Sequence, residues 1–285
     1  MAYRQNRNLV LFTDLDGTLL DHAHYRWEAA REALDAVKRR DVPLVVVTSK
    51  TRAEVLAVLK DLGLHGPFVV ENGGATYLPA RYFPFPIGGA VSARRGWQRV
   101  AYGTPRYCLV SALSDAAQRV RVLVRSFSEM SISEVAELAG LALNQARAAR
   151  QREFDEPFVI QDGDAQAWPR LQTEIHRLGF GCTRGSRFFH VLGKNDKGWA
   201  VRQLTGWFRR TRGPELRTAG LGDSPNDIPL LRVVDVPNLV ARPGGRYDPE
   251  ALASVPNVRR AGGVGPEGWN RAVLELLGKA DKAAD

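Results

Sequence analysis

Two aspartates stand two residues apart, directly after a short apolar segment near the start of the chain. The apolar residues are 8–13 (NLVLFT), and the segment 14–18 (DLDGT) follows them. Alternate residues of an extended strand face the same side, so Asp14 and Asp16 can both face one site. Gly17 lets the chain turn sharply just after them. Such a pair either binds a hard cation or divides the roles of nucleophile and acid/base, and its place at a strand end argues against a solvated surface turn.

A second acidic cluster occupies residues 222–227 (GDSPND), again after a short apolar segment. Asp223 can add a third oxygen ligand for Mg²⁺ beside the first pair, because Mg²⁺ binds few carboxylates and completes its octahedron with water and phosphate oxygens. The same residues have the pattern of a helix start, with Pro225 in the first turn. Capping a helix does not exclude binding a metal, so we expect both.

A lysine and a hydroxyl group lie at comparable positions. Lys197 precedes an expected helix, and Ser49 follows the apolar segment 42–47, between Thr48 and Lys50. Ammonium and hydroxyl groups are suitable donors for a phosphoryl oxygen whose charge shifts during transfer. A single surface lysine or serine is usually only solvated, so the position at strand ends is what singles these two out.

The elements that must position these residues alternate along the first part of the chain. We expect buried strands at 8–13, 42–47 and 68–70, with helices at 27–40 and 53–62. Strands that alternate with helices imply βαβ units and a parallel sheet. In such sheets the chemistry lies beyond the carboxyl ends of the strands, and the polar segments come directly after these strands.

The pattern changes in the middle of the chain. The segment 79–105 is rich in Pro, Gly and aromatic residues and is interpreted as an exit linker. A separate α+β unit follows, with strands expected at 106–111, 158–161 and 187–192 and helices at 115–126, 131–140 and 168–178. The first pattern resumes with a helix at 198–210, strands at 218–221 and 236–240, and a helix at 269–277. The fold class predicted is α/β, a Rossmann-like parallel-sheet core of residues 1–85 and 191–285 with an inserted α+β cap domain of residues 86–190.

Composition bounds the class of protein. A chain of 285 residues, 44% hydrophobic and 25% charged, is long enough for two globular domains. Its longest apolar run, 42–47, is far too short to span a membrane, and the first eight residues do not resemble a secretory signal. Two cysteines, Cys108 and Cys182, exclude a disulfide scaffold and a four-cysteine zinc site. We therefore expect a cytoplasmic protein without a membrane partner.

The charge balance allows an anionic partner. Forty basic residues against 31 acidic ones give a net charge of +9, and only seven of the basic residues are lysines. Guanidinium groups bind phosphate and carboxylate in a bidentate way. The arginines are scattered, however, and their densest groups lack the aromatic interleaving of a single-strand binder. A nucleic-acid-binding protein is the alternative from another class, and we expect no nucleic acid partner; the oligomeric state is unknown at this stage.

Taken together, the motifs resemble those of a known family. Four sites resemble, in chain order, the four signature motifs of the haloacid dehalogenase superfamily of phosphatases. They are the segment 14–18, the serine at the second strand end, Lys197 and the segment 222–227. The extra unit lies between the second and third motifs, as in the type IIB capped branch. The resemblance implies that Asp14 attacks phosphorus to form an aspartyl phosphate. It also implies that Asp16 protonates the leaving alkoxide and then takes a proton from water.

The resemblance also implies a metal site and a phosphate site. Mg²⁺ would be held by Asp14, the backbone carbonyl of Asp16, and Asp223. Ser49 and Lys197 would hold phosphoryl oxygens, and the metal and phosphate shell would be supported by Asn226 and Asp227. Many relatives have Thr-Gly-Arg where this chain has residues 49–51 (SKT), so Thr48 is the alternative hydroxyl of the second motif.

A finer resemblance concerns the substrate. The segments 48–51 (TSKT), 71–74 (ENGG), 152–158 (REFDEPF), 193–198 and 265–269 (GPEGW) resemble the mannosyl-3-phosphoglycerate phosphatase family. The implied substrate is a small phosphorylated glycosyl-glycerate, with a phosphate, a carboxylate and a sugar. The implied substrate-binding residues are Ser49, Lys50, Asn72, Arg152, Arg187, His190 and Asn226.

Alternatives stay open for these assignments. Arg152 can instead be an ion-pair partner of Glu153 or Glu156, and His190 can be an ordinary strand residue. The activity can instead be that of a phosphatase for another sugar phosphate or for glucosyl-3-phosphoglycerate. It can also be a phosphomannomutase-like transfer, in which a sugar hydroxyl takes the place of water.

Overall fold

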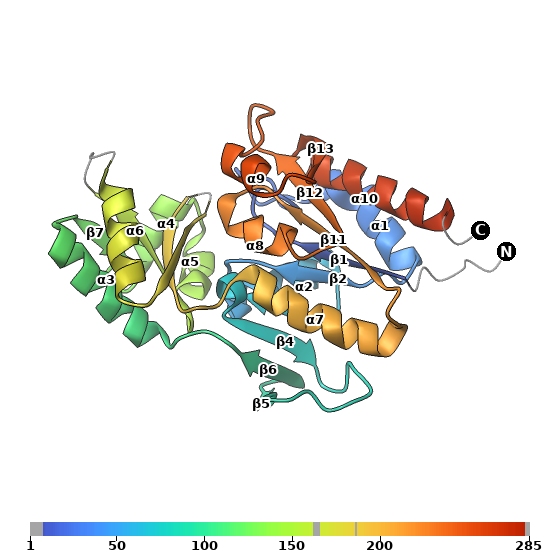
Figure 1. Cartoon of the computed structure of the whole chain (residues 1–285), viewed down its shortest axis with the longest axis horizontal. Coiled ribbons are helices and arrows are strands. Elements are labelled where there is room, and N and C mark those ends of the chain that lie inside the picture. Colours follow the sequence, from blue (N-terminus) through green and yellow to red (C-terminus); the bar gives the residue numbers. More distant parts are fainter. Residues whose placement is uncertain (1–7, 162–165, 186, 283–285) are drawn as a thin grey trace.

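The chain forms a larger and a smaller α/β unit, joined side by side (Figure 1). The computed structural model describes residues 8–161, 166–185 and 187–282. The first seven residues, on which the expectation about secretion rests, lie outside this description. The larger unit carries both ends of the described chain, and the smaller one is the insertion between them.

A nine-stranded sheet forms the centre of the larger unit. Its order is β13-β12-β11-β1-β2-β3-β4-β6-β5. Strand β1 pairs in parallel with β2 on one side and with β11 on the other, which confirms the predicted parallel sheet. The last strands on one edge, β4, β6 and β5, are antiparallel. The strands are β1 (Leu9–Thr13), β2 (Leu44–Val47), β3 (Phe68–Val70), β4 (Ala75–Pro79), β5 (Val91–Ala93), β6 (Trp97–Ala101), β11 (Arg217–Gly222), β12 (Val236–Ala241) and β13 (Arg259–Val264).

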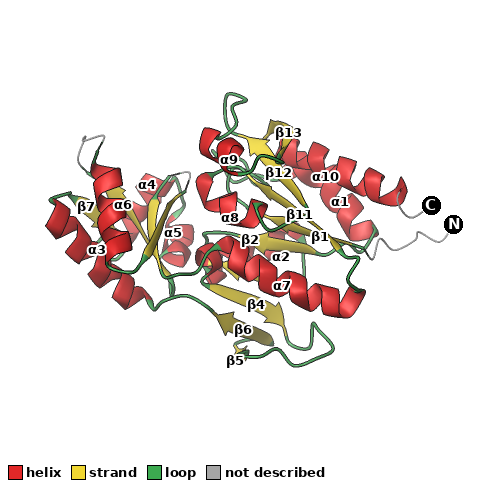
Figure 2. Ribbon diagram, in the orientation of Figure 1, coloured by secondary structure: helices red, strands yellow, loops and turns green. Residues whose placement is uncertain are grey.

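Helices cover both faces of this sheet, and alternate residues of β1 pack into two different apolar clusters. Leu9 and Leu11 pack with the buried residues of α1, α2 and α10, whereas Val10 and Phe12 pack with those of α7, α8 and α9. Strands buried on both faces are the expected result of βαβ connections. Figure 2 shows the helical layers on the two sides of the yellow sheet. The helices are η1 (Glu28–Ala30), α1 (Arg31–Arg39), α2 (Arg52–Leu62), η2 (Glu71–Gly73), α7 (Lys197–Arg212), η3 (Pro225–Asp227), α8 (Ile228–Leu231), α9 (Pro249–Ser254) and α10 (Gly265–Lys282).

The smaller unit, called the cap below, contains a four-stranded antiparallel sheet in the order β7-β8-β10-β9. One apolar cluster joins this sheet to α3 and α6, and a second joins it to the hairpin of α4 and α5. Helix α4 begins with a reciprocal capping box formed by Ser131 and Glu134. The elements are α3 (Arg106–Val120), β7 (Val124–Ser126), α4 (Ile132–Ala139), α5 (Leu143–Ala149), β8 (Asp155–Ile160), α6 (Ala167–Arg177), β9 (Gly181–Arg184) and β10 (Phe189–Leu192).

The structure moves the start of the cap. The segment interpreted as a linker contains β5 and β6, which extend the large sheet through β4. The strand expected at 106–111 is the first part of helix α3, which begins after Pro105. The boundary predicted at residue 86 is therefore too early, and the cap begins after β6. The two strands are short and rich in polar side chains, so they lack the apolar run that identified the central strands.

No helix in the described part of the chain combines the length and apolar composition that crossing a membrane requires.

Candidate active site

Asp14 comes directly after β1, at the carboxyl end of a central strand of the large sheet. Its backbone N–H donates to the carbonyl of Leu221, and its side chain is buried. The hydroxyl of Thr13 donates to the carbonyl of Asp14 at 2.7 Å and accepts the indole N–H of Trp269 at 2.9 Å. The C-terminal helix thus helps to fix the chain at Asp14.

Gly17 occupies a position that strongly favours glycine. Its φ is +81°, and a Cβ there would lie 2.8 Å from Oδ2 of Asp223. Both the positive φ and the close approach favour glycine. The turn after Asp16 therefore brings the chain against the second acidic motif.

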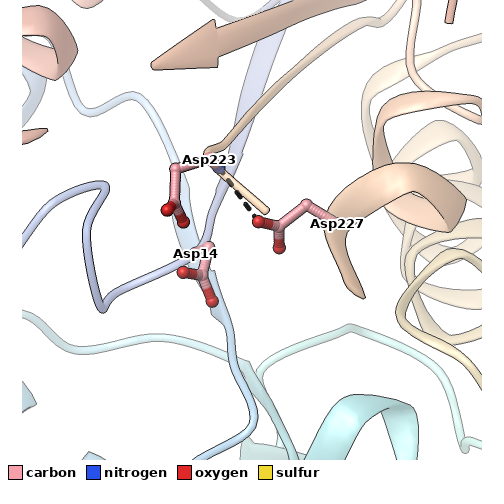
Figure 3. A group of neighbouring side chains, drawn as sticks. All are labelled: Asp14, Asp223 and Asp227. Atoms are coloured by element: carbon pink, nitrogen blue, oxygen red, sulfur yellow. Dashed lines mark hydrogen bonds between the residues drawn. The ribbon is translucent and has the colours of Figure 1, made fainter. Parts of the chain in front are cut away.

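Three carboxylates from two separate motifs meet at this edge of the sheet. Asp14 follows β1, Asp223 follows β11 and Asp227 lies in η3, and one oxygen of each lies within 4.8 Å of the others (Figure 3). Burial raises the pKa of Asp14 well above its usual value, and the attraction of Lys197 offsets this only in part. Burial and the nearby Asp227 raise the pKa of Asp223 to about 7. Like charges in a dry site repel each other, so the cluster is suited to a cation.

The three carboxylates differ in their hydrogen-bond partners. Asp227 is engaged on both oxygens: Oδ1 accepts from Lys197 at 2.7 Å, and Oδ2 accepts from the backbone N–H groups of Asp223 and Ser224. The bond to the Asp223 backbone is the dashed line in Figure 3. Asp223 is held by longer contacts, since Oδ1 lies 3.4 Å from the hydroxyl of Thr18 and Oδ2 lies 3.4 Å from Arg242, and Asp227 holds the loop that carries Asp223. This arrangement fits the hard oxygen donor set that Mg²⁺ requires.

Lys197 is the first residue of α7, and its side chain is fully buried. The carboxylate of Asp196 caps the helix by accepting the N–H of Trp199 at 2.7 Å. The Lys197 ammonium lies 2.6 Å from Oδ1 of Asp14 and 2.7 Å from Oδ1 of Asp227. Burial alone would lower the pKa of Lys197, but the two carboxylates raise it, so the side chain stays charged.

The side chain of Asp16 pairs with a different lysine from the one that joins Asp14 to Asp227. Its Oδ2 lies 2.8 Å from the ammonium of Lys50, which also lies 3.8 Å from Glu54. Its Oδ1 is buried and has no hydrogen-bond partner among the described residues. Lys50 was predicted to bind substrate, but in the structure its ammonium pairs with Asp16.

The second motif offers two hydroxyl groups, and the structure favours the serine. Ser49 lines the cavity described below. Thr48 is buried, and its hydroxyl accepts the backbone N–H of Lys50 at 3.2 Å. The backbone carbonyl of Ser49 accepts from Arg152 of the cap at 2.9 Å.

A cavity lies between the core and the cap, and it brings most of the predicted residues together. The core contributes Asp14, Asp16, Ser49, Lys50 and Asn226 to its lining, and the cap contributes Arg152, Arg187 and His190. Asn72 is not part of this lining. Its amide donates to Asp155 at 2.9 Å and accepts from Asn226 at 3.1 Å, so it connects the cap with the core.

Asp155 was missed by the sequence analysis, although it organises the cap side of the cavity. This buried carboxylate lies 2.9 Å from Nδ1 of His190 and 3.3 Å from Arg152. Burial would raise the pKa of Asp155, but His190 and Arg152 outweigh it and lower the pKa. Neither alternative expected for Arg152 is correct, because Glu153 pairs with Arg99 and Glu156 with Arg106. In the sequence, Asp155 was only one of three acids in four residues.

Arg187 reaches from the cap to the core. It donates to the carbonyl of Ala139 in the cap and, at 2.6 Å, to the carbonyl of His22 in the core. Its guanidinium lies 5.6 Å from the ring centre of Tyr25, a second residue that the sequence analysis missed. Tyr25 has a φ of 57°, and a loop residue with positive φ leaves no signal in composition or spacing.

A parallel sheet with an acidic cluster at the end of its central strand, and a cap inserted after the second motif, defines a class of hydrolase. The sequence model of that class, described as haloacid dehalogenase-like hydrolase, matches residues 11–82. The chain belongs to the haloacid dehalogenase-like hydrolases.

Two curated relatives extend this result over nearly the whole chain. Both are called glucosyl-3-phosphoglycerate/mannosyl-3-phosphoglycerate phosphatase. The protein from Methanococcoides burtonii is 39% identical over 95% of this chain and 97% of its own length. The protein from Persephonella marina is 35% identical over 96% of this chain and 99% of its own length. These similarities confirm the resemblance drawn from the motifs, and the chain is a phosphoric monoester hydrolase.

A solved structure supports the fold. A subclass IIB sugar phosphatase of the same superfamily superposes with a TM-score of 0.62, at 16% identity, over 94% of this chain and 97% of that one. The α/β core with an inserted α+β cap is thus confirmed.

Proposed function

We propose that this protein is a Mg²⁺-dependent phosphatase that hydrolyses mannosyl-3-phosphoglycerate to mannosylglycerate and phosphate. The observation that carries the proposal is the composition of the cavity between core and cap that contains Asp14 and Asp16. The core side presents Asp14 and Asp16, and the cap side presents Arg152, Arg187 and His190. A phosphate ester that also bears a carboxylate matches both sides.

The first half of the reaction forms a covalent intermediate. A carboxylate oxygen of Asp14 attacks phosphorus, and the bond between phosphorus and the glycerate oxygen breaks. Asp16 gives its proton to the departing oxygen through Oδ1, the oxygen that Lys50 leaves free. Lys197, held at Asp14, donates to a phosphoryl oxygen.

The second half releases phosphate. A water molecule attacks the phosphorus of the aspartyl phosphate, Asp16 takes the proton of that water, and the bond from phosphorus to Asp14 breaks. Both residues are then as they were at the start. Two displacements with one residue as acid and then base are the usual use of covalent catalysis.

The metal would be held by Asp14, Asp223 and the backbone carbonyl of Asp16. When bound, Mg²⁺ supplies positive charge that offsets the repulsion between the anionic nucleophile and an anionic phosphate. The raised pKa values of Asp14 and Asp223 support this assignment, since burial and the neighbouring carboxylates outweigh the attraction of Lys197 for Asp14 and of Arg242 and Lys197 for Asp223. Asp227 and Asn226 would hold the loop behind the metal.

The glycerate carboxylate would be bound by the cap. Arg152 and His190 are both held by the buried Asp155, so their cationic or N–H groups are fixed before substrate arrives. Arg187 lies at the same cavity. Fixed donors bind an anion with a smaller loss of side-chain entropy.

A second candidate substrate is glucosyl-3-phosphoglycerate. Both curated relatives carry the glucosyl and the mannosyl name together, which favours one site that accepts both sugars. The phosphate and the carboxylate are shared by these two substrates, and Arg152 and His190 face only those shared groups in our assignment.

The test is phosphate release from a panel of esters, with Mg²⁺ and with a chelator. The panel contains both glycosyl-3-phosphoglycerates, the matching sugar phosphates without a carboxylate, and p-nitrophenyl phosphate. We expect the highest kcat/KM for the glycosyl-phosphoglycerates and no turnover with chelator. Preference for a plain sugar phosphate would contradict the substrate. Transfer of the phosphoryl group to an added sugar, without phosphate release, would contradict hydrolysis.

A further inference from the structure

The loop before helix η1 holds one tyrosine in an unusual conformation. Tyr25 has a φ of 57°, in a region that non-glycine residues occupy at an energetic cost. The carboxylate of Asp21 maintains this loop, since it accepts the backbone N–H groups of Ala23, His24 and Arg26 at 2.6–2.8 Å. The loop is thus built to present the Tyr25 side chain.

Tyr25 contacts the cap on one side. Its hydroxyl donates to the carbonyl of Ala139, the last residue of α4, at 3.0 Å. Arg187 donates to the same carbonyl and lies 5.6 Å from the ring centre. Burial and the nearby Asp16 raise the pKa of Tyr25, so its hydroxyl keeps the proton that it donates. These contacts exist only while the cap is docked on the core.

Tyr25 also contacts the catalytic side. The ammonium of Lys50 lies 4.6 Å from the centre of the tyrosine ring, within the range of a cation–π interaction. The same ammonium lies 2.8 Å from Oδ2 of Asp16 and 3.8 Å from Glu54. A lysine side chain has four rotatable bonds, and three neighbours restrict this one to a single position.

We propose that Tyr25 is a positioning residue that couples the docked cap to the orientation of Asp16, with Lys50 as the link. The docked cap fixes the tyrosine ring, the ring and Glu54 fix the Lys50 ammonium, and the ammonium fixes one oxygen of Asp16. The other oxygen, Oδ1, has no hydrogen-bond partner among the described residues and is thereby left for the leaving group. The inference rests on the acid role that we have proposed for Asp16.

The experiment compares two leaving groups. Proton transfer matters for an alkoxide, as in mannosyl-3-phosphoglycerate, and matters little for p-nitrophenolate. We expect Tyr25→Ala to lower kcat for the alkyl ester about 100-fold, and kcat for p-nitrophenyl phosphate less than about threefold. Tyr25→Phe keeps the ring and loses only the bond to Ala139, so its alkyl-ester loss should be smaller than that of Tyr25→Ala.

Tyr77→Phe is the matched control. The Tyr77 hydroxyl also joins the core to the cap, since it donates to Glu153 at 3.1 Å, but it has no link to Lys50. We expect equal effects of this change on both esters. If Tyr25→Ala also lowers both rates equally, Tyr25 only holds the cap and the proposal is wrong.

Two further variants make the result decisive. Asp16→Asn should show the same selectivity for leaving groups in a stronger form. If Asp16→Asn lowers the rates for both esters equally, the acid role of Asp16 is wrong. If Asp16→Asn is selective for the alkyl ester and Tyr25→Ala is not, only the link through Tyr25 is wrong. Should Tyr25→Ala not fold, Lys50→Met removes the same link, and equal losses on both esters would then overturn the proposal. Circular dichroism and thermal melting check the fold of each variant.

Discussion

The ammonium of Lys197 lies 2.6 Å from Oδ1 of Asp14, and both side chains are buried. The same ammonium lies 2.7 Å from Asp227, so one cation joins Asp14 to the loop that carries Asp223. The motifs at 14–18 and 222–227 lie about 200 residues apart in the sequence, and the side chain of Lys197 holds them together. The consequences for activity and for stability can be measured separately.

Lys197→Met should lower kcat by at least about 100-fold, because a donor to the phosphoryl group is lost. It should also destabilise the fold by roughly 3–5 kcal/mol, because the carboxylates of Asp14 and Asp227 lose their buried counter-charge. Steady-state kinetics and chemical denaturation measure the two effects. Lys194→Met is the control, since Lys194 is exposed three residues earlier, and both quantities should stay unchanged.

Asp14→Asn should abolish turnover and leave the fold intact, because an amide has nearly the same shape as a carboxylate but is a poor nucleophile. The acid-quenched wild-type enzyme should carry a phosphoryl group that intact-mass analysis detects, and the variant should carry none. Asp35→Asn, at an exposed position of α1, is the control. Activity of Asp14→Asn within tenfold of wild type would refute the nucleophile assignment.

The raised pKa of Asp223 predicts how the metal-free protein responds to pH. Its pKa is about 7 in the fold, against a usual value of 3.8, so the folded state keeps a proton that the unfolded state has lost between these values. Stability from this group therefore falls as pH rises from about 4 to about 7. In the presence of a chelator, Asp223→Asn should lose less thermal stability than wild type over this window.

Mg²⁺ should reverse the effect in wild type. A bound cation replaces the proton on Asp223, so the rise in Tm caused by Mg²⁺ should be larger at pH 8 than at pH 5. In Asp223→Asn this dependence of the rise on pH should be absent. Differential scanning calorimetry at several pH values, with Mg²⁺ and with chelator, measures this. An increase in Tm that is equal at both pH values would show that Asp223 does not compete between proton and metal.

Asp155→Asn should raise the KM for a carboxylate-bearing substrate by about tenfold or more, because Arg152 and His190 lose the charge that holds them. The kcat for p-nitrophenyl phosphate, which has no carboxylate, should change less than about threefold. Glu156→Gln is the matched control, since Glu156 is buried in the same strand and pairs with Arg106. A similar loss of stability but an unchanged KM is expected for that variant.

The sequence predicted the part of the site around Asp14, because each of its motifs follows an apolar strand. Asp14, Ser49 and Asp223 could be placed at one edge of a sheet before any coordinates, since parallel strands bring their carboxyl ends together. Lys197 could be placed only as the start of a helix. Its contact with Asp14 depends on how α7 packs against the sheet, which no local pattern encodes.

The remaining features depend on contacts between distant segments. Asn72 was assigned to substrate from a family resemblance, and that resemblance did not reveal that its amide donates to Asp155 of the cap. Tyr25 depends on a positive φ that Asp21 stabilises from four residues away. Strands β5 and β6 have no apolar run, because an antiparallel edge can leave one face to solvent. In each case the missing information was a tertiary partner.

Strand β1 lies between β2 and β11, and these two neighbours are made at very different times. Strand β2 leaves the ribosome soon after β1, whereas β11 begins about 200 residues later, at Arg217. At roughly 5–20 residues per second, β1 waits about 10–40 seconds with one edge unpaired. The whole cap is synthesised during this interval, so it can fold before β1 pairs with its second neighbour, β11. During translation, the apolar strand next to Asp14 therefore keeps an unpaired edge at which aggregation can start.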